Sequence, residues 1–127
     1  MLQENALKIY GLEKIDRKLP VYVVEGPFDS TFVNNSVALC GSDGDIRGLD
    51  GCDIILVYDN EPRNREIVKR IEGCIGQNQK VVIWPSDIVE KDINDMVLTG
   101  HNVMGVLKSN TYTGLQAKVK FNNWKKI

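Results

Sequence analysis

The amino-acid sequence predicts an α/β fold, a Rossmann-like parallel sheet of about four strands with helices on both faces. Three strand-like segments, 20–24, 53–58 and 80–84, are apolar after their first residue and lack the polar alternation of a half-exposed strand, so each is expected to be buried on both sides. Segments of helical character separate these runs along the chain. Apolar strands that alternate with helices form parallel sheets, because each parallel pair needs a crossover connection.

Local sequence predicts each element in turn. Pro20 opens the first apolar run and Pro85 closes the third. Ile67, Val68 and Ile71 have helical spacing, which predicts a helix that begins after the second run and ends near 73–76. The other expected segments are a short helix over 27–34, a small apolar run over 37–40, a glycine-rich loop over 41–51, a short helix over 93–98 and a final helix over about 112–124.

Length and composition favour one domain with a core of its own. The chain has 127 residues and is 43% hydrophobic, which suffices to form one hydrophobic core without disulfide bonds. No stretch approaches the roughly 18 apolar residues of a membrane span, and the N-terminus does not resemble a signal peptide. The chain has three cysteines and no CxxC pair; they are Cys40, Cys52 and Cys74. We therefore expect neither a disulfide framework nor structural zinc, and we expect the protein to reside in a reducing cytosol.

The charge of the chain is divided unevenly. Residues 1–95 carry 11 basic and 17 acidic side chains, whereas residues 96–127 carry five lysines and no acid. Such a split is typical of an anion-binding tail beside an acidic centre, and equally of a solvated lysine face on a terminal helix.

Acidic side chains follow three of the predicted strands, at Glu25, Asp29, Asp59, Glu61 and Asp92. Ligands of open α/β sheets gather beyond the carboxyl ends of the strands. A single acid there is usually a helix cap or a turn former, but clustered carboxylates repel one another unless a cation neutralises them. Oxygen ligands without His or Cys suit Mg²⁺ or Mn²⁺, so the pattern predicts a metal site suited to phosphoryl transfer.

These residues carry a family resemblance. Glu25-Gly26 with Asp29 after one hydrophobic strand, and Asp59-x-Glu61 after a later one, resemble the TOPRIM domain of primases, type IA and II topoisomerases and certain nucleases. The resemblance covers about residues 19–100. Segment 91–95, Lys-Asp-Ile-Asn-Asp, is similar to a segment of bacterial-type primases and phage primase–helicases. The amino-acid sequence as a whole is most similar to the TOPRIM part of DNA primases of T-even-like phages.

The resemblance assigns roles by matching positions. Glu25 matches the motif glutamate, a proposed general acid or base in topoisomerases that lies at the metal site in primases. Asp59 and Glu61 match the paired metal ligands. Asp29 matches the second acid of the first motif, and Asp92 the leading acid of the third. All five are therefore expected to be catalytic, and Glu25, Asp59 and Glu61 to bind the metal.

The sequence departs from the family pattern at two places. Glu61 stands where the family usually has aspartate, and its longer side chain moves the carboxylate outward by about one methylene. Pro62-Arg63 stands where the family often has glycine. Neither departure forbids metal binding, but both bear on catalytic competence.

The resemblance implies a function and a setting. It implies a single TOPRIM-like domain over 1–127, with a core at about 19–100 and a basic C-terminal helical segment at about 108–127. Such a domain would use Mg²⁺ or Mn²⁺ and act as a DNA-primase-type nucleotidyltransferase that makes RNA primers in phage DNA replication. The implied partners are a single-stranded DNA template, nucleoside triphosphates, and a replicative helicase or another primase domain, with no membrane. The implied location is the cytoplasm of a bacterial or phage-infected cell.

Two other functions are compatible with the same residues. A small TOPRIM nuclease would use the carboxylates to activate water and cleave DNA or RNA. An inactive replication or recombination module would keep the fold for docking only.

Basic residues provide candidate nucleic-acid contacts. Arg63 and Arg65 follow the second motif, where they either contact phosphate or are ordinary solvated helix residues. Four lysines of the tail interleave with aromatic residues, as in a single-strand-binding surface, and are Lys118, Lys120, Lys125 and Lys126. The alternative is an amphipathic helix that packs Tyr112, Phe121 and Trp124 inward. Trp84 is expected in the core, and His101 in a surface turn without a nearby partner.

Overall fold

A computed structural model describes residues 9–10, 15–39 and 51–127. Most of the expected glycine-rich loop, residues 41–50, lies outside the described residues. In chain order the elements are β1 (Ile9–Tyr10), β2 (Val21–Val24), α2 (Pro27–Ser30), β3 (Ser36–Leu39), β4 (Ile54–Leu56), α3 (Arg65–Gly76), β5 (Lys80–Val82), α4 (Ile93–Thr99), α5 (Val103–Ser109), β6 (Thr111–Tyr112) and α6 (Gly114–Trp124).

One sheet of six strands organises the fold, in the order β1-β3-β2-β4-β5-β6. The four central strands are parallel, with Val23 paired to Val37 on one side and to Leu56 on the other. The edge strands β1 and β6 are antiparallel to their neighbours. The predicted α/β fold with about four parallel strands is confirmed. The two edge strands were not predicted, because two residues each are too few for a periodic pattern.

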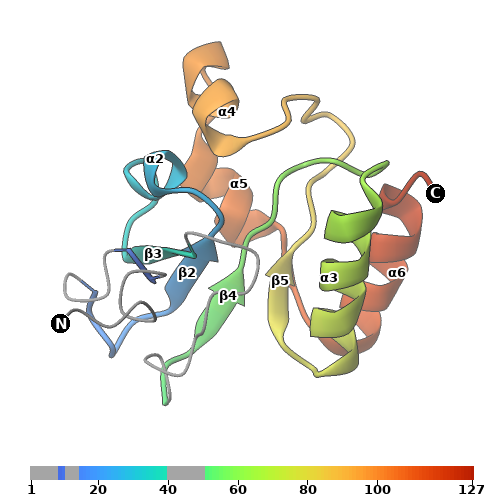
Figure 1. Ribbon diagram of the computed structural model, residues 1–127, viewed down its shortest axis with the longest axis horizontal. Helices are drawn as coiled ribbons and strands as arrows, with labels where there is room; N and C mark the ends of the chain where they lie inside the picture. Colours follow the sequence, from blue (N-terminus) through green and yellow to red (C-terminus); the bar gives the residue numbers. More distant parts are fainter. Residues whose placement is uncertain (1–8, 11–14, 40–50) are drawn as a thin grey trace, which may run out of the picture.

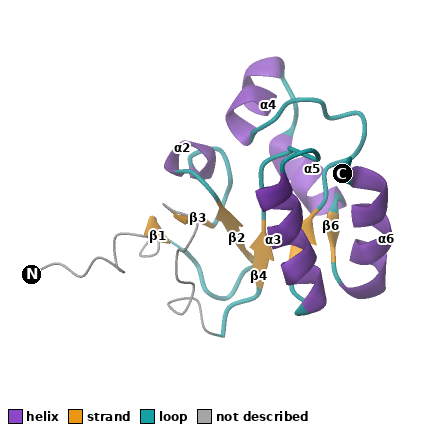
Figure 2. Cartoon of the chain, turned by 45° about the vertical axis from the view of Figure 1, so that its right-hand side comes forward, coloured by secondary structure: helices purple, strands orange, loops and turns teal. Residues whose placement is uncertain are grey.

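Helices cover the sheet on both faces, as predicted. In Figure 1, α3 and α6 lie side by side to the right of β5, and α5 lies behind the sheet. Figure 2 shows the same arrangement from the side, with α2 and α4 near the ends toward which the central strands point. All four residues of β2 are buried, which explains its continuous apolar sequence. None of the helices in the described part of the chain combines the length and the apolar character that a membrane span requires.

The C-terminal segment belongs to the hydrophobic core. Phe121 and Trp124 of α6 are buried, and their rings stack with centroids 6.3 Å apart. Trp84 is also buried and donates its indole N–H to the Tyr58 carbonyl over 2.8 Å. Inward packing of the aromatic residues of α6, one of two alternatives from the sequence, is therefore confirmed, as is the core position of Trp84.

Several predicted boundaries were wrong. The helix expected over 27–34 ends at Ser30, because the chain must turn through the left-handed Asn35 (φ 52°) to enter β3. The final helix begins at Gly114 rather than near Tyr112, since Tyr112 belongs to β6. The helix α5 was not predicted. It is short and contains Gly105, which weakens its helical pattern.

Leu107→Ala tests whether α5 is a structural part of the core. Leu107 is 0% exposed, so the truncation should lower the free energy of unfolding by about 2 to 5 kcal/mol through lost burial and a residual cavity. Leu98, which is 77% exposed, provides the control, and Leu98→Ala should change stability by about 0.5 kcal/mol or less. Urea denaturation measures both, and equal losses would contradict the placement of α5.

Candidate active site

The sheet topology creates a switch point between β2 and β4. The chain leaves β2 toward β3 on one side, and leaves β4 toward β5 on the other. Connections that diverge in this way open a crevice beyond the carboxyl ends of the two strands, where α/β proteins bind ligands. Glu25 directly follows β2, and Asp59 lies just beyond β4. The fold therefore delivers these two predicted residues to one crevice.

The Glu25 carboxylate joins the two strand ends. One oxygen accepts a hydrogen bond from the backbone N–H of Asp59 over 3.0 Å. The other lies 3.6 Å from the guanidinium of Arg70 on α3, which also contacts Glu66 at 3.4 Å. Glu25 is thus held in one orientation by a backbone donor from the loop after β4 and a cation from α3.

The helix α2 and the start of α4 each bring one more acid to the crevice. Asp92 caps α4, and its side chain accepts the backbone N–H of Asp95 over 2.8 Å. Burial, with the nearby carboxylate of Asp92 next in importance, raises the pKa of Asp29, whereas the backbone N–H of Asn94 acts to lower it. Asp29 on α2 therefore lies against the first turn of α4. Asp92 serves as a helix cap and also contributes charge to the crevice.

Asp59 has the most strongly perturbed carboxyl group of the crevice. Burial, followed by the charges of four neighbouring carboxylates, raises the pKa of Asp59 to about 7. Those neighbours are Glu25, Asp29, Asp92 and Glu61. We call these five residues, including Asp59, the acidic cluster. Four of the five acids predicted from the sequence therefore act on the fifth, Asp59.

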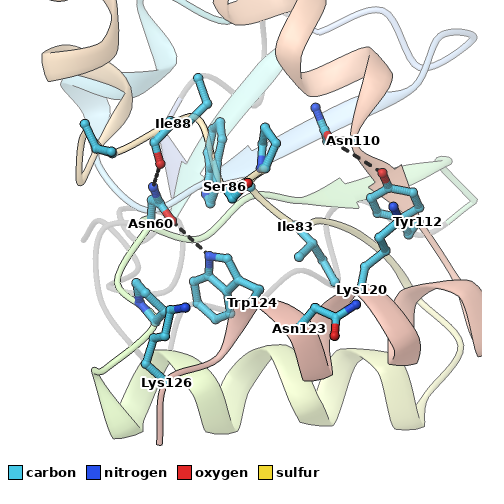
Figure 3. Close-up of a pocket in the computed structure, with 14 residues that line it drawn as sticks. Asn60, Ile83, Ser86, Ile88, Asn110, Tyr112, Lys120, Asn123, Trp124 and Lys126 are labelled. Carbon is cyan, nitrogen blue, oxygen red and sulfur yellow. Dashed lines mark hydrogen bonds between the residues drawn. The ribbon is translucent and has the colours of Figure 1, made fainter.

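Asn60 fixes the loop that carries two members of the acidic cluster, Asp59 and Glu61. Its amide nitrogen donates to the carbonyls of Ile88 and Glu90 at 2.9 and 3.0 Å. Its amide oxygen accepts the indole N–H of Trp124 at 2.9 Å (Figure 3). The side chain thereby ties the loop to the segment after β5 and to α6.

The backbone of the same loop is anchored as well. The N–H of Asn60 donates to the carbonyl of Lys91 over 2.6 Å, and the carbonyl of Pro62 accepts the N–H of Lys126 over 2.8 Å. Asn60 was missed by the sequence analysis, because its only signal was its position between two acids. The contacts of its side chain span up to 64 residues and leave no local pattern.

The predicted basic residues take different positions. Arg63 and Arg65 are exposed on either side of Asn64, the residue that caps α3. Among the described residues, the arginine that pairs with the acidic cluster is Arg70, which was not predicted. A signal for it was available, since Arg70 lies three residues after the buried Ile67 and hence beside the buried stripe of α3.

The lysines divide between two sides of α6. Lys120 lies over the ring of Tyr112, 5.5 Å from its centroid, and Lys125 lies 5.1 Å from that of Phe121. Lys118 lines a hollow formed with the end of α3. The backbone contact of Lys126 with Pro62 brings the end of the chain beside the loop of the acidic cluster.

His101 has a partner, contrary to the prediction that it lacked one. Its Nε2 lies 2.8 Å from a carboxylate oxygen of Glu90. The backbone of Glu90 lowers the pKa of this carboxyl, and the contact with His101 adds to the effect. Because the carbonyl of Glu90 also accepts from Asn60, His101 supports the segment that holds the loop of the acidic cluster.

Comparison with known proteins relates the chain to a DNA primase. It is 36% identical over 129 residues to the DNA primase of Enterobacteria phage T4. The aligned region covers 97% of this chain and 37% of the phage protein. No family model matches the chain. The chain is thus primase-related, and it spans little more than a third of the relative it matches.

Replacing Asp59 by asparagine should change how stability depends on pH. With its pKa raised to about 7, folded Asp59 holds a proton that the unfolded chain loses near pH 4. The free energy of unfolding should therefore fall as pH rises between these values. Asp59→Asn removes this loss, so at pH 8 the variant should be more stable than the parent by about 1 to 2 kcal/mol, after allowance for solvent screening.

The measurement is denaturant unfolding from pH 4 to 8 without divalent cations. Asp87 is exposed and is not among the groups that raise the pKa of Asp59, so Asp87→Asn is the matched control. A parallel pH profile for the parent and Asp59→Asn would contradict the electrostatic account of the cluster.

Proposed function

We propose that the chain is the Mg²⁺-dependent TOPRIM catalytic part of a DNA primase that makes RNA primers on single-stranded DNA during phage replication. The observation that carries this proposal is the acidic cluster at the switch point, in which four carboxylates raise the pKa of a fifth. Similarity to a phage DNA primase supports the primase class. The proposed setting is the cytoplasm of a phage-infected bacterium.

The donor set suits a hard divalent cation. A carboxyl group with a pKa near 7 among other carboxylates lacks a compensating positive charge, and Mg²⁺ or Mn²⁺ would supply one. Across the described segments, no three His, Cys, Asp or Glu side chains are arranged to hold an ion by themselves. Mg²⁺ needs no such cage, because it usually takes one or two carboxylates together with water and substrate phosphates. Asp59 and Glu61 would provide those carboxylates, and Glu25 would lie beside them.

Each member of the acidic cluster has a role in this proposal. Primer synthesis joins nucleotides when a 3′ hydroxyl attacks the α-phosphate of a nucleoside triphosphate and pyrophosphate leaves. Bound Mg²⁺ would neutralise charge on the triphosphate. Glu25, oriented by Arg70 and by the N–H of Asp59, is positioned to accept the hydroxyl proton. Asp29 and Asp92 would maintain the negative potential that attracts the cation.

A thermal-shift experiment tests the metal site. Mg²⁺ or Mn²⁺ should raise the melting temperature of the parent chain, because a ligand that binds the folded state stabilises it by mass action. Asp59→Asn should abolish the rise, whereas Asp87→Asn, with the same change of charge, should keep it. A rise that persists in Asp59→Asn would place the metal elsewhere.

An activity assay separates the proposed function from its alternatives. With Mg²⁺, a single-stranded template and labelled nucleoside triphosphates, the chain should incorporate label, assayed with and without a replicative helicase. Glu61→Gln and Asp59→Asn should each lower the rate by about a hundredfold or more, as expected for loss of transition-state charge stabilisation. Cleavage of labelled DNA without incorporation would instead identify a nuclease. Neither activity, together with no metal-induced shift, would identify a docking module.

A further inference from the structure

A cavity of about 520 Å³ is lined in part by Asn60, the residue between Asp59 and Glu61, and by no member of the acidic cluster. Figure 3 shows it between the segment that follows β5 and the C-terminal helix α6. Asn60 and Pro62 line it from the loop on either side of Glu61, and Ser86 from the segment after β5. The cavity is thus separate from the acidic cluster, but the two share a wall.

The charge of this cavity is opposite to that of the acidic cluster. Its lining includes Lys120 and Lys126 and no acidic residue. The ring of Tyr112 lies beneath the ammonium group of Lys120, which keeps that lysine at the cavity wall. The cavity therefore favours an anion, although it adjoins the most acidic region of the protein.

The rest of the lining suits a flat and partly apolar body. The indoles of Trp84 and Trp124 and the side chain of Ile83 provide apolar wall, and Asn123 and Ser86 provide hydrogen-bonding groups. The volume falls in the range of about 300 to 1,000 Å³ that is typical of sites for small molecules. An anionic group joined to a planar ring with polar edges matches this combination.

We propose that this cavity binds a nucleoside phosphate, with the base against the apolar wall and the phosphate at Lys120 and Lys126. The inference rests on the proposed function for its choice of ligand class. It goes further by dividing the four tail lysines into a pair that lines the cavity and a pair, Lys118 and Lys125, that does not. Asn60, hydrogen-bonded on both sides, would transmit occupancy of the cavity to the loop of the acidic cluster.

A binding assay with two double variants tests the division of the lysines. Lys120→Gln/Lys126→Gln removes the cavity pair, and Lys118→Gln/Lys125→Gln removes the same charge from the same segment. The probes are fluorescent single-stranded oligo(dT) and ATP, both in EDTA so that metal binding at the acidic cluster takes no part. The Lys120→Gln/Lys126→Gln variant should bind the probes tenfold or more weakly than the parent chain. The Lys118→Gln/Lys125→Gln variant should bind them at most threefold more weakly. Loss of two phosphate contacts should also lower the log–log salt slope for oligo(dT) by about 1.4.

The two probes distinguish the sources of the nucleoside phosphate. If the Lys120→Gln/Lys126→Gln variant loses affinity only for oligo(dT), the cavity binds a nucleic-acid strand. If it loses affinity only for ATP, the cavity binds a free nucleotide. Ser86→Phe gives independent evidence, because it fills the cavity mouth without altering charge and should weaken the same probe. The inference would be overturned if both double variants weakened probe binding equally, or if the parent chain bound neither probe.

Failure of this inference differs from failure of the proposed function. If only the cavity assignment is wrong, the metal-induced shift and primer synthesis remain, and the two lysine pairs behave alike. If only the primase proposal is wrong, label incorporation is absent, and the Lys120→Gln/Lys126→Gln variant still weakens probe binding selectively.

Discussion

The parallel pairing of β2 with β4 is the constraint on which the acidic cluster depends. It aligns Val23 with Leu56, so that the two strands end at the same edge and Glu25 reaches the backbone N–H of Asp59. The neighbouring strands β3 and β5 then take the chain away in opposite directions, which leaves the crevice open. Without this register, the other acids would not lie close enough to raise the pKa of Asp59.

The carboxylates gathered in the crevice repel one another, and contacts with the surrounding structure hold them in place. Carboxylates that are half-buried together destabilise the fold in the absence of a cation, a cost typical of functional sites. Only part of it is offset locally, by Arg70 beside Glu25 and by the backbone N–H of Asn94 near Asp29. Asn60 and the buried Trp124 hold the loop in place instead, which explains why a C-terminal helix remote in sequence supports the site.

The sequence predicted what depends on local pattern. Buried parallel strands are apolar throughout, so 20–24, 53–58 and 80–84 were identified together with the acids that follow them. What it could not predict depends on distant contacts or on very short elements. The role of Asn60 needs the partner Trp124, 64 residues away, and β6 has only two residues. The position of His101 beside Glu90 was likewise invisible, because it follows from the path of the chain between β5 and α5.

Paramagnetic broadening by Mn²⁺ most directly tests the central claim, that the acidic cluster at the switch point is a divalent-metal site. Substoichiometric Mn²⁺ added to the isotope-labelled chain broadens the resonances of nuclei near the ion. The account predicts that the backbone amide signals of Gly26, Asp59, Asn60 and Glu61 disappear first. Excess Mg²⁺ should restore them by competition. Broadening centred on another region, such as the surroundings of Asp53 or Asp87, or none at stoichiometric Mn²⁺, would contradict the account.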